Sequence, residues 1–291
     1  MSPCSVSQSV SNLSQDERMR GVLRLLETRD AVHVSELSKL FSVSEVTIRS
    51  DLSALARRGL VARVRGGVRA LQRGHSELGF DLRLRLEAER KQAIAQAAAA
   101  MVDDGEAVAL DSSTTAYYLA LELRPKKELV VVTNGLLIAA ALADAPGINV
   151  LVTGGLLRLQ AMSLVGELGS DVLRSTTINK GFLGARGLSL QRELMDLNPE
   201  EVRIKHEMAD ACERVIGIFD CTKWHKTALL SFVPADRVNA IVTDSSAPTD
   251  EVAAWRAHGV EVTTVDAPAK GGAPVRSQAL RPIDRVEQEA G

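Results

Sequence analysis

Residues 37–68, LSKLFSVSEVTIRSDLSALARRGLVARVRGGV, decide the fold of the N-terminal part of this 291-residue chain. Apolar residues recur at helical spacing on both sides of a three-residue break at 42–44: Val34, Leu37 and Phe41 before it, and Ile48, Leu52 and Leu55 after it. Ser44 is the expected N-cap of the second helix, and Gly59 is expected to end it. Residues 60–68 predict a small β-ribbon, with Gly66 and Gly67 at its turn or exit.

A further helix precedes this stretch, because apolar residues fall at positions i, i+3, i+4 and i+7: Met19, Val22, Leu23 and Leu26. Two short helices joined by a tight turn and followed by an arginine-bearing ribbon have the layout of a winged helix-turn-helix. Residues 17–72 hold eleven Arg or Lys and six Asp or Glu, a net charge of +5, although the whole chain carries −2. A basic module joined to an acidic remainder favours a polyanion as the partner of the first module.

The helix that follows Ser44 carries the candidate base-reading face. With its apolar stripe inward, the opposite face presents Val46, Arg49, Ser50, Ser53 and Arg57. Arg49 can donate two hydrogen bonds to guanine, Val46 can contact a thymine methyl group, and the short side chains of Thr47 and Ser50 allow close approach. Arg57, Arg58, Arg63 and Arg65 are better placed for phosphates. The alternative is a solvated basic face on a domain that binds another protein.

The chain beyond residue 72 predicts an α/β fold. Apolar runs bounded by turn residues, most of them separated by helical stretches, are typical of strands buried on both faces of a mostly parallel sheet. The runs are 107–110, 129–132, 150–152, 182–183, 215–219 and 240–242, and an alanine-rich helix is expected over 84–102. The expected division is a disordered arm (1–15), the winged helix-turn-helix domain (16–72), a linker (73–83), an α/β domain (84–266) and a disordered tail (267–291).

Small polar residues follow three of the expected strands. The first loop holds Asp111, Ser112, Ser113, Thr114 and Thr115, the second holds Thr133 and Asn134, and the third holds Gly154 and Gly155 with Arg158 after them. Loops at the carboxyl ends of parallel strands line one crevice, which is the usual ligand position in such sheets. Hydroxyl groups at a helix start suit an anion, although residues 111–115 alone are equally typical of an N-cap with a turn.

Other chemistries find little support. The chain lacks the glycine-rich dinucleotide and ATP-binding motifs, and it has no GxSxG motif of a serine hydrolase. His206, Cys212, Cys221 and His225 do not have zinc-finger spacing, so we expect no metal and no cofactor. No apolar run reaches the roughly 18 residues of a membrane span, which favours a cytoplasmic protein without a membrane partner.

The first module resembles the DeoR family of bacterial transcription regulators. The resemblance rests on residues 37–68, quoted above, and on the preceding helix DERMRGVLRLLE (16–27). This chain has Ser50 where the family usually has Arg. The resemblance implies that the module binds operator DNA.

The second module resembles the effector domain of the same family. The motifs, in the family's order, are FDLRLRLEAERKQAIAQAAA (80–99), LDSSTT (110–115), VVTNGLLIA (131–139), VTGG (152–155), GFLGARGL (181–188), EEVRIKHEM (200–208), FDCTKW (219–224) and IVTD (241–244). The family usually has DSGTT, so Ser113 replaces a glycine. The resemblance implies a fold similar to ribose-5-phosphate isomerase and a phosphorylated sugar as effector.

The resemblance also assigns roles to the loop residues. Asp111, Ser113, Thr114 and Thr115 would hold phosphate or sugar hydroxyls, and Thr133, Asn134, Gly154 and Gly155 would frame the pocket. Lys205, otherwise an ordinary surface lysine, would supply positive charge.

Together the two modules predict a ligand-switched repressor of a carbohydrate catabolic operon. Its expected partners are double-stranded operator DNA, a phosphorylated sugar and a second copy of itself, because dimers read repeated half-sites. The alternative is a sugar-phosphate isomerase that carries a DNA-binding domain. Isomerisation needs a carboxylate base beside the sugar, and Asp111 is the only acid in the three loops, so the sequence favours sensing over catalysis.

Overall fold

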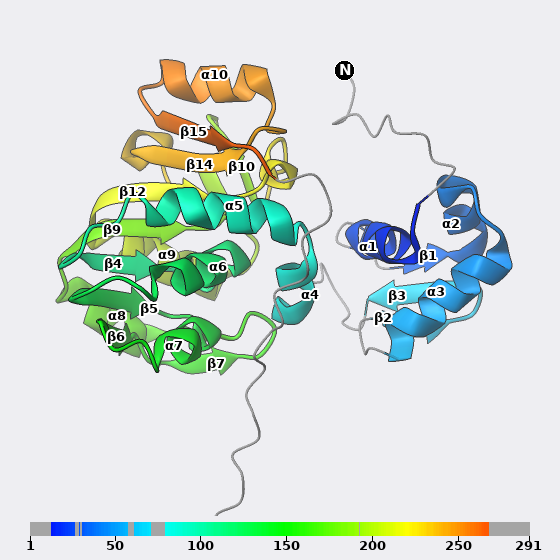
Figure 1. Ribbon diagram of the computed structural model, residues 1–291, viewed down its shortest axis with the longest axis horizontal. Helices are drawn as coiled ribbons and strands as arrows, with labels where there is room; N and C mark the ends of the chain where they lie inside the picture. The colour runs from blue at the N-terminus through cyan, green and yellow to red at the C-terminus, as the bar shows by residue number, and fades with distance from the viewer. Residues whose placement is uncertain are drawn as a thin grey trace, which may run out of the picture.

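The computed structural model describes residues 13–26, 29, 31–57, 61–70, 79–191 and 193–267. Expectations about the arm before residue 13, Arg58, Gly59, Leu60, the linker residues 73–78 and the tail after residue 267 lie outside the described residues. Figure 1 shows the two modules, the first in blue and the second in cyan to orange.

The first module combines three helices with a three-stranded antiparallel sheet. Its elements are α1 (Gln15–Leu26), β1 (Ala31–His33), α2 (Val34–Phe41), α3 (Glu45–Arg57), β2 (Val61–Val64) and β3 (Gly67–Ala70), and the strand order is β1-β3-β2. The ribbon and all three helices were predicted, but β1 was missed. Gly67 permits the extra pairing, because a Cβ there would lie 2.1 Å from the carbonyl oxygen of Val32.

The turn between α2 and α3 follows from local chemistry. Ser42 adopts a left-handed conformation (φ 52°), and its N–H donates to carbonyl groups at the end of α2. Ser44 then caps α3, because its hydroxyl accepts a hydrogen bond from the N–H of Thr47 at 3.1 Å. The predicted N-cap is therefore confirmed.

A buried ion pair fixes α3 against α1. The guanidinium of Arg18 donates to both carboxylate oxygens of Asp51, at 2.7 and 3.2 Å, and Asp51 is 1% exposed. The apolar stripes predicted from the sequence form the core beside this pair, with Leu37, Ile48 and Leu52 fully buried. Because its inner face is held at several points, α3 presents a fixed outer face.

The second module is built on a seven-stranded parallel sheet. In spatial order the strands are β15 (Glu261–Val265), β14 (Ala240–Asp244), β12 (Cys212–Ile218), β9 (Ile178–Leu183), β4 (Ala107–Leu110), β5 (Leu129–Thr133) and β6 (Ile148–Val152). All six predicted apolar runs contribute to it. With the winged helix-turn-helix before it, this sheet confirms the predicted fold class, while β15 was missed.

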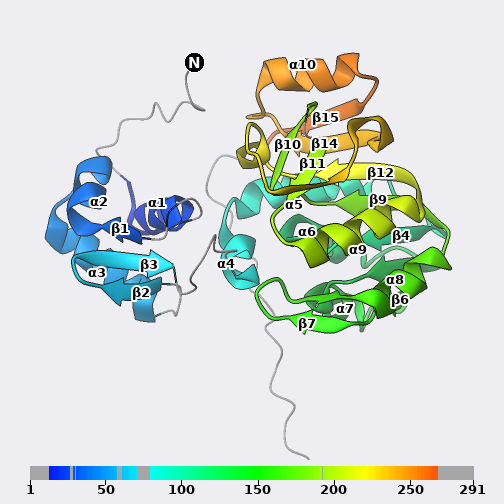
Figure 2. The same cartoon turned by 180° about the vertical axis from the view of Figure 1, so that it is seen from behind.

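Helices cover both faces of the sheet. One face packs against α5 (Ala88–Ala99), α6 (Thr114–Leu123) and α7 (Leu136–Leu142), and the other against α8 (Glu167–Arg174), α9 (Pro199–Asp210) and α10 (Thr249–Ala257). Figures 1 and 2 show α5, α6 and α7 on one side, and α8 and α9 on the other. Neighbouring strand residues such as Val108 and Ala109 enter different cores, which explains the continuous apolar runs.

Short elements at the strand ends were missed as well. They are the hairpin β7 (Leu156–Arg158) and β8 (Ser163–Val165), the small sheet of β10 (Gly187–Ser189), β11 (Glu193–Asp196) and β13 (Leu230–Val233), and the short helices η2 (Cys221–Lys223) and η3 (Ala235–Arg237). Segments of three or four residues carry too few positions for a periodic signal.

The alanine-rich helix expected over 84–102 is wrong as a single helix. The chain forms α4 (Phe80–Arg85), turns through Leu86 and Glu87, and then begins α5. Glu87 has a left-handed conformation (φ 52°), which breaks the helical hydrogen bonding. The break lets α4 pack against the first module while α5 packs on the sheet. The last part of the expected 73–83 linker is therefore helical.

Candidate functional site

The outer face of α3 and the β2–β3 wing form one polar surface. Val46 is 76% exposed, and Arg49, Ser50 and Arg57 are exposed beside it. From the wing, Arg63 donates to the hydroxyl of Ser53 at 2.9 Å and to the carbonyl oxygen of Arg49 at 3.3 Å. The structure thus brings together the predicted base-reading and wing residues, with Arg65 exposed at the tip of the wing.

Asp111 organises the loop after β4. Its Oδ1 accepts the N–H of Ser113 at 3.2 Å, and its Oδ2 accepts the N–H of Gly184 at 2.9 Å. Ser113 in turn caps α6, because its hydroxyl accepts the N–H of Ala116 at 3.1 Å. The loop is close-packed, since a Cβ at Gly184 would lie 2.5 Å from the Cβ of Ser113. The N-cap interpretation of this segment is confirmed.

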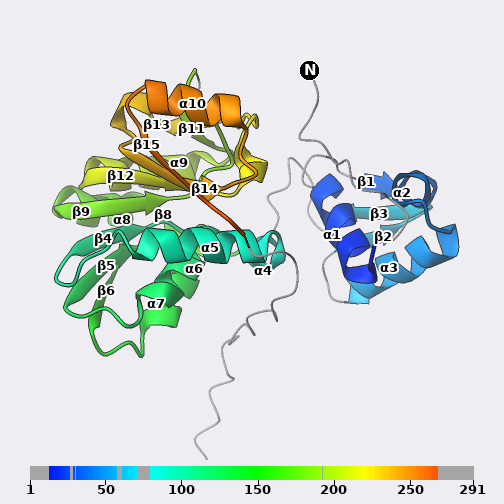
Figure 3. The same cartoon turned by 45° about the horizontal axis from the view of Figure 1, so that its top comes forward.

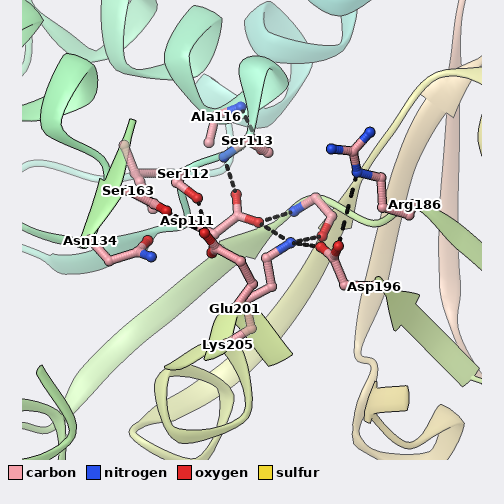
Figure 4. Close-up of polar contacts among 12 residues, drawn as sticks. Asp111, Ser112, Ser113, Ala116, Asn134, Ser163, Arg186, Asp196, Glu201 and Lys205 are labelled. Atoms are coloured by element: carbon pink, nitrogen blue, oxygen red, sulfur yellow. Dashed lines mark hydrogen bonds and ion pairs between the residues drawn. The ribbon is translucent and has the colours of Figure 1, made fainter. Parts of the chain in front are cut away.

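Lys205 lies at the centre of a buried charge network (Figure 4). Its ammonium nitrogen is 3.0 Å from Oδ2 of Asp111 and 2.7 Å from Oδ2 of Asp196, and it donates to the carbonyl oxygen of Gly184 at 3.0 Å. Burial lowers the pKa of Lys205, but the charges of Asp196 and Asp111 outweigh it and raise the pKa above its usual value. Lys205 is therefore charged but already neutralised, contrary to the expectation that its charge would be offered to an anion.

Asp196 extends the network toward Arg186. Burial raises the pKa of Asp196, but the charges of Lys205 and Arg186 outweigh this effect and hold the pKa at about 2. The Nε of Arg186 lies 3.9 Å from Oδ1 of Asp196. Negative and positive groups thus alternate from Asp111 to Arg186, and three of these four side chains are less than 10% exposed.

A second network surrounds Glu201, which is 2% exposed. Its carboxylate accepts hydrogen bonds from Arg158 at 2.5 Å, from Ser112 at 3.3 Å and from the hydroxyl of Ser163. Arg158 and Ser112, both predicted to contact an effector, are therefore joined through Glu201.

The other two loops support the site from outside the cavity. The Thr133 hydroxyl donates to the carbonyl oxygen of Leu110 at 2.7 Å, and the Asn134 amide donates to the carbonyl oxygen of Leu164 at 3.3 Å. Gly154 and Gly155 have positive φ, and a Cβ at Gly155 would lie 2.3 Å from the carbonyl oxygen of Val165. Their contacts hold the loops together.

A cavity of about 540 Å³ opens beside the Asp111 loop. Its lining includes residues 112–115, and so the start of α6. Six basic side chains line it, Arg83, Lys91, Arg186, Lys205, Lys223 and Lys226, together with four acidic ones, Glu87, Asp196, Glu201 and Asp220. This cavity joins hydroxyl groups to an excess of positive charge, a combination that suits an anion with hydroxyl groups.

Sequence reasoning missed several residues of this cavity. Asp196 and Glu201 lie in segments of weak periodicity, and Lys91 is hidden in the alanine-rich helix. The motif FDCTKW holds Lys223, but it served only as part of the family resemblance, and no role was predicted for the lysine. One signal was present, because Glu201 and Lys205 are four residues apart and so share one face of α9.

Among the residues that the structure describes, no group of three His, Cys, Asp or Glu side chains could hold a metal ion. Within the same ranges, Cys212 and Cys221 form no disulfide, and no helix is long and apolar enough to cross a membrane.

Known proteins resemble the chain in both modules. Residues 18–73 match the model of the DeoR-like helix-turn-helix domain, and residues 86–245 match that of the DeoR C terminal sensor domain. A putative aga operon transcriptional repressor of Escherichia coli O157:H7 is 32% identical over 251 residues, which cover 86% of this chain and 93% of the relative. The glycerol-3-phosphate regulon repressor of Escherichia coli strain K12 is 28% identical over 250 residues, 86% of this chain and 99% of that protein.

Solved structures give a weaker likeness. Ribose 5-phosphate isomerase from Plasmodium falciparum aligns with 48% of this chain and 54% of its own, at 14% identity and a TM-score of 0.35.

Proposed function

Because this chain belongs to the DeoR family of transcription regulators, we propose that it represses a carbohydrate catabolic operon and is released from its operator by a phosphorylated sugar bound in the cavity. The relatives described above are named as repressors of the aga operon and of the glycerol-3-phosphate regulon. The observation that carries the proposal is the cavity itself, in which hydroxyl groups and an excess of basic side chains meet at a helix start.

The phosphate group is proposed to lie against the start of α6. Thr114 and Thr115 are the first residues of that helix, where backbone N–H groups and the helix dipole favour an anion. Lys91 and Lys223 line the same cavity, and because they share one buried carboxylate, Asp220, they leave one positive charge in excess. This assignment replaces Lys205 as the source of charge, since two carboxylates already neutralise it.

The sugar hydroxyls are proposed to face the two buried networks. Asp196, Glu201 and Arg186 line the cavity, and their charged groups can accept or donate hydrogen bonds to hydroxyl groups. Asp111 and Arg158 then act as supports, because they lie outside the lining and contact residues of the wall. Thr133, Asn134, Gly154 and Gly155 also lie outside the lining and belong to the loops behind it.

The DNA-binding assignment rests on the outer face of α3. We propose that Val46, Thr47, Arg49, Ser50 and Ser53 face the major groove, and that Arg57, Arg63 and Arg65 contact phosphates. Ser44 acts through its cap on α3. A homo-oligomer acting in the cytoplasm is part of the proposal, because one such module buries too little surface for tight operator binding.

An isomerase is the alternative function. The cationic groups beside the acids of the cavity argue against it. A general base works best when its pKa lies near the working pH, whereas the pKa of Asp196 is about 2. The other acids of the wall are also held by cationic groups. Glu87 pairs with Arg90 and Glu201 with Arg158. Burial raises the pKa of Asp220, but the charges of Lys223 and Lys91 outweigh this effect and lower it. We therefore propose that the protein has no enzymatic activity.

The test is a thermal-shift panel of pentose and hexose phosphates, with each unphosphorylated sugar as its control. The proposal expects one phosphorylated sugar to raise the melting temperature and to weaken binding to operator DNA in a fluorescence titration. Product formation during incubation would instead support the isomerase. A panel in which no sugar phosphate alters operator affinity would contradict the proposal.

A further inference from the structure

Helix α4 packs into the core of the first module, although the chain continues from it directly into α5 of the second module. Leu82 and Leu86 are each 5% exposed, and they pack in the same apolar cluster as α1 residues such as Leu23 and Leu26. All three ribbon views place α4 as the element of the second module that faces α1 (Figure 3). A displacement of α4 would therefore disturb the packing of the DNA-binding module.

The same helix forms part of the cavity wall. Arg83, Leu86 and Glu87 line the cavity, and so does Leu25 of α1. The cavity is thus enclosed partly by the DNA-binding module, and a bound ligand lies next to the junction between the two modules.

Lys91 connects the cavity to the end of α4. Its side chain is buried at 4% exposure, and its ammonium group donates to the carbonyl oxygen of Leu86 at 2.7 Å and to that of Arg83. Carbonyl groups at the end of a helix have no intrahelical N–H partner, so this lysine replaces the missing donors. Lys91 also lines the cavity. One ammonium group therefore holds α4 and faces the ligand.

We propose that an anion in the cavity competes with the Arg83 and Leu86 carbonyl oxygens for Lys91 and thereby loosens α4 from the second module. This inference rests on the proposed function, because it explains how the bound sugar phosphate alters DNA binding. A hydrogen bond from an ammonium to a phosphate is stronger than one to a neutral carbonyl, so the exchange favours the ligand.

Other contacts keep α4 attached while the turn that follows it is released. The N–H of Phe80 donates to the carbonyl oxygen of Gln160 at 2.8 Å, and the hydroxyl of Tyr118 donates to the carbonyl oxygen of Leu84 at 3.2 Å. Neither contact involves Lys91. Phe80 at the start of α4 and Leu84 near its end thus stay bound, and the turn at Leu86 and Glu87 is the part that moves.

The first experiment needs no ligand. Lys91→Met removes the donor to α4, and the amides of residues 80–86 are expected to exchange with deuterium at least about fivefold faster than in the wild type. Lys126→Met is the matched control, because Lys126 also donates to a carbonyl oxygen, that of Val102, but does not line the cavity. If the amides of residues 80–86 exchange in Lys91→Met at the wild-type rate, the proposal is wrong.

The second experiment adds the sugar phosphates of the thermal-shift panel and inorganic phosphate. A compound that calorimetry shows to bind both the wild type and Lys91→Met is expected to change wild-type operator affinity about fivefold or more, within the usual range of allosteric coupling, and to leave that of Lys91→Met unchanged. If the operator affinity of both proteins responds equally, the proposed role of Lys91 in transmitting the signal is wrong, while the proposed function still holds. If no sugar phosphate changes wild-type operator affinity, the proposed function fails, and the exchange experiment still decides whether Lys91 holds α4.

A second variant, at the contact between α4 and the first module, tests the proposal independently in case Lys91→Met does not fold. Leu82→Ala keeps the cavity and both hydrogen bonds of Lys91, but it weakens the packing of α4 on the first module. It is expected to bind the same compounds as the wild type by calorimetry, while its operator affinity responds at least about threefold less. A full response in Leu82→Ala would show that α4 does not transmit the signal.

Discussion

The ammonium nitrogen of Lys205 lies 3.0 Å from Oδ2 of Asp111, and the two side chains are 5% and 0% exposed. Asp196 lies on the other side of the same nitrogen, at 2.7 Å. The lysine therefore neutralises two buried carboxylates that would otherwise repel each other. The first role of Lys205 is therefore structural, because its charge allows both carboxylates to be buried side by side.

We predict that Lys205→Met strongly destabilises the protein. Removing one partner of a buried ion pair leaves uncompensated charge, which costs about 3 to 5 kcal/mol. Urea unfolding followed by circular dichroism measures the loss. Lys127→Met is the control, because its side chain is exposed and lies outside the cavity, and it should change the free energy of unfolding by less than about 0.5 kcal/mol. Equal stability of Lys205→Met and the wild type would show that the network is not stabilising.

Asp196 is expected to make stability depend on acid pH. Its pKa is about 2 in the folded protein, against roughly 3.9 in an unfolded chain, so the folded state binds fewer protons between these values. The stabilisation is present above about pH 4 and is lost as the pH falls toward about 2, amounting to roughly 2 to 3 kcal/mol.

Unfolding in urea at several pH values between 2 and 5 tests this dependence. Asp196→Asn should flatten the stability profile in that range. Asp144→Asn is a suitable comparison, because Asp144 also pairs with an arginine but is exposed. The explanation is wrong if Asp196→Asn keeps the full wild-type slope.

Arg49→Ala is expected to weaken operator binding by about 1 to 3 kcal/mol and to relax the preference at one base position. The reason is that Arg49 lies on the exposed face of α3, where its guanidinium can reach guanine. Binding to a set of single-base operator variants measures the effect. Arg65→Ala should instead weaken binding equally on all of them and reduce the salt dependence. Unchanged binding by Arg49→Ala would mean that another face of α3 enters the groove.

Thr115→Val is expected to remove the response to the sugar phosphate while ligand-free operator binding stays intact. The substitution keeps the shape of the side chain but deletes a hydroxyl that lines the cavity at the start of α6. Titration of operator binding with the active compound measures the response. Thr133→Val, outside the lining, keeps the response. A wild-type titration curve for Thr115→Val would exclude this part of the cavity as the phosphate site.

The sequence was most informative where one pattern fixes one position. The apolar stripe through Ile48, Leu52 and Leu55 determined which face of α3 is buried, and it therefore predicted the exposure of Val46 and Arg49. In the same way, continuous apolar runs predicted the parallel sheet, and the serine before α6 predicted its N-cap.

The sequence was least informative where a contact joins distant residues. Lys205 and Asp111 are 94 positions apart, and no local pattern shows that their charges meet. The break at Glu87 depends on a left-handed conformation that glutamate rarely adopts. The helical pattern continues across this residue, so the sequence predicted a single helix. Two acids of the cavity wall, Asp196 and Glu201, come from β11 and α9, whose approach to the Asp111 loop depends on packing between distant segments.

The tight contact between Gly184 and Ser113 limits how this loop can evolve. A side chain at 184 would collide with the Cβ and hydroxyl of Ser113, which belong to a short side chain that cannot move aside. Alanine at 184 thus becomes acceptable only after glycine has replaced Ser113. With the serine in place, a side chain at 184 is expected to strain the loop after β4.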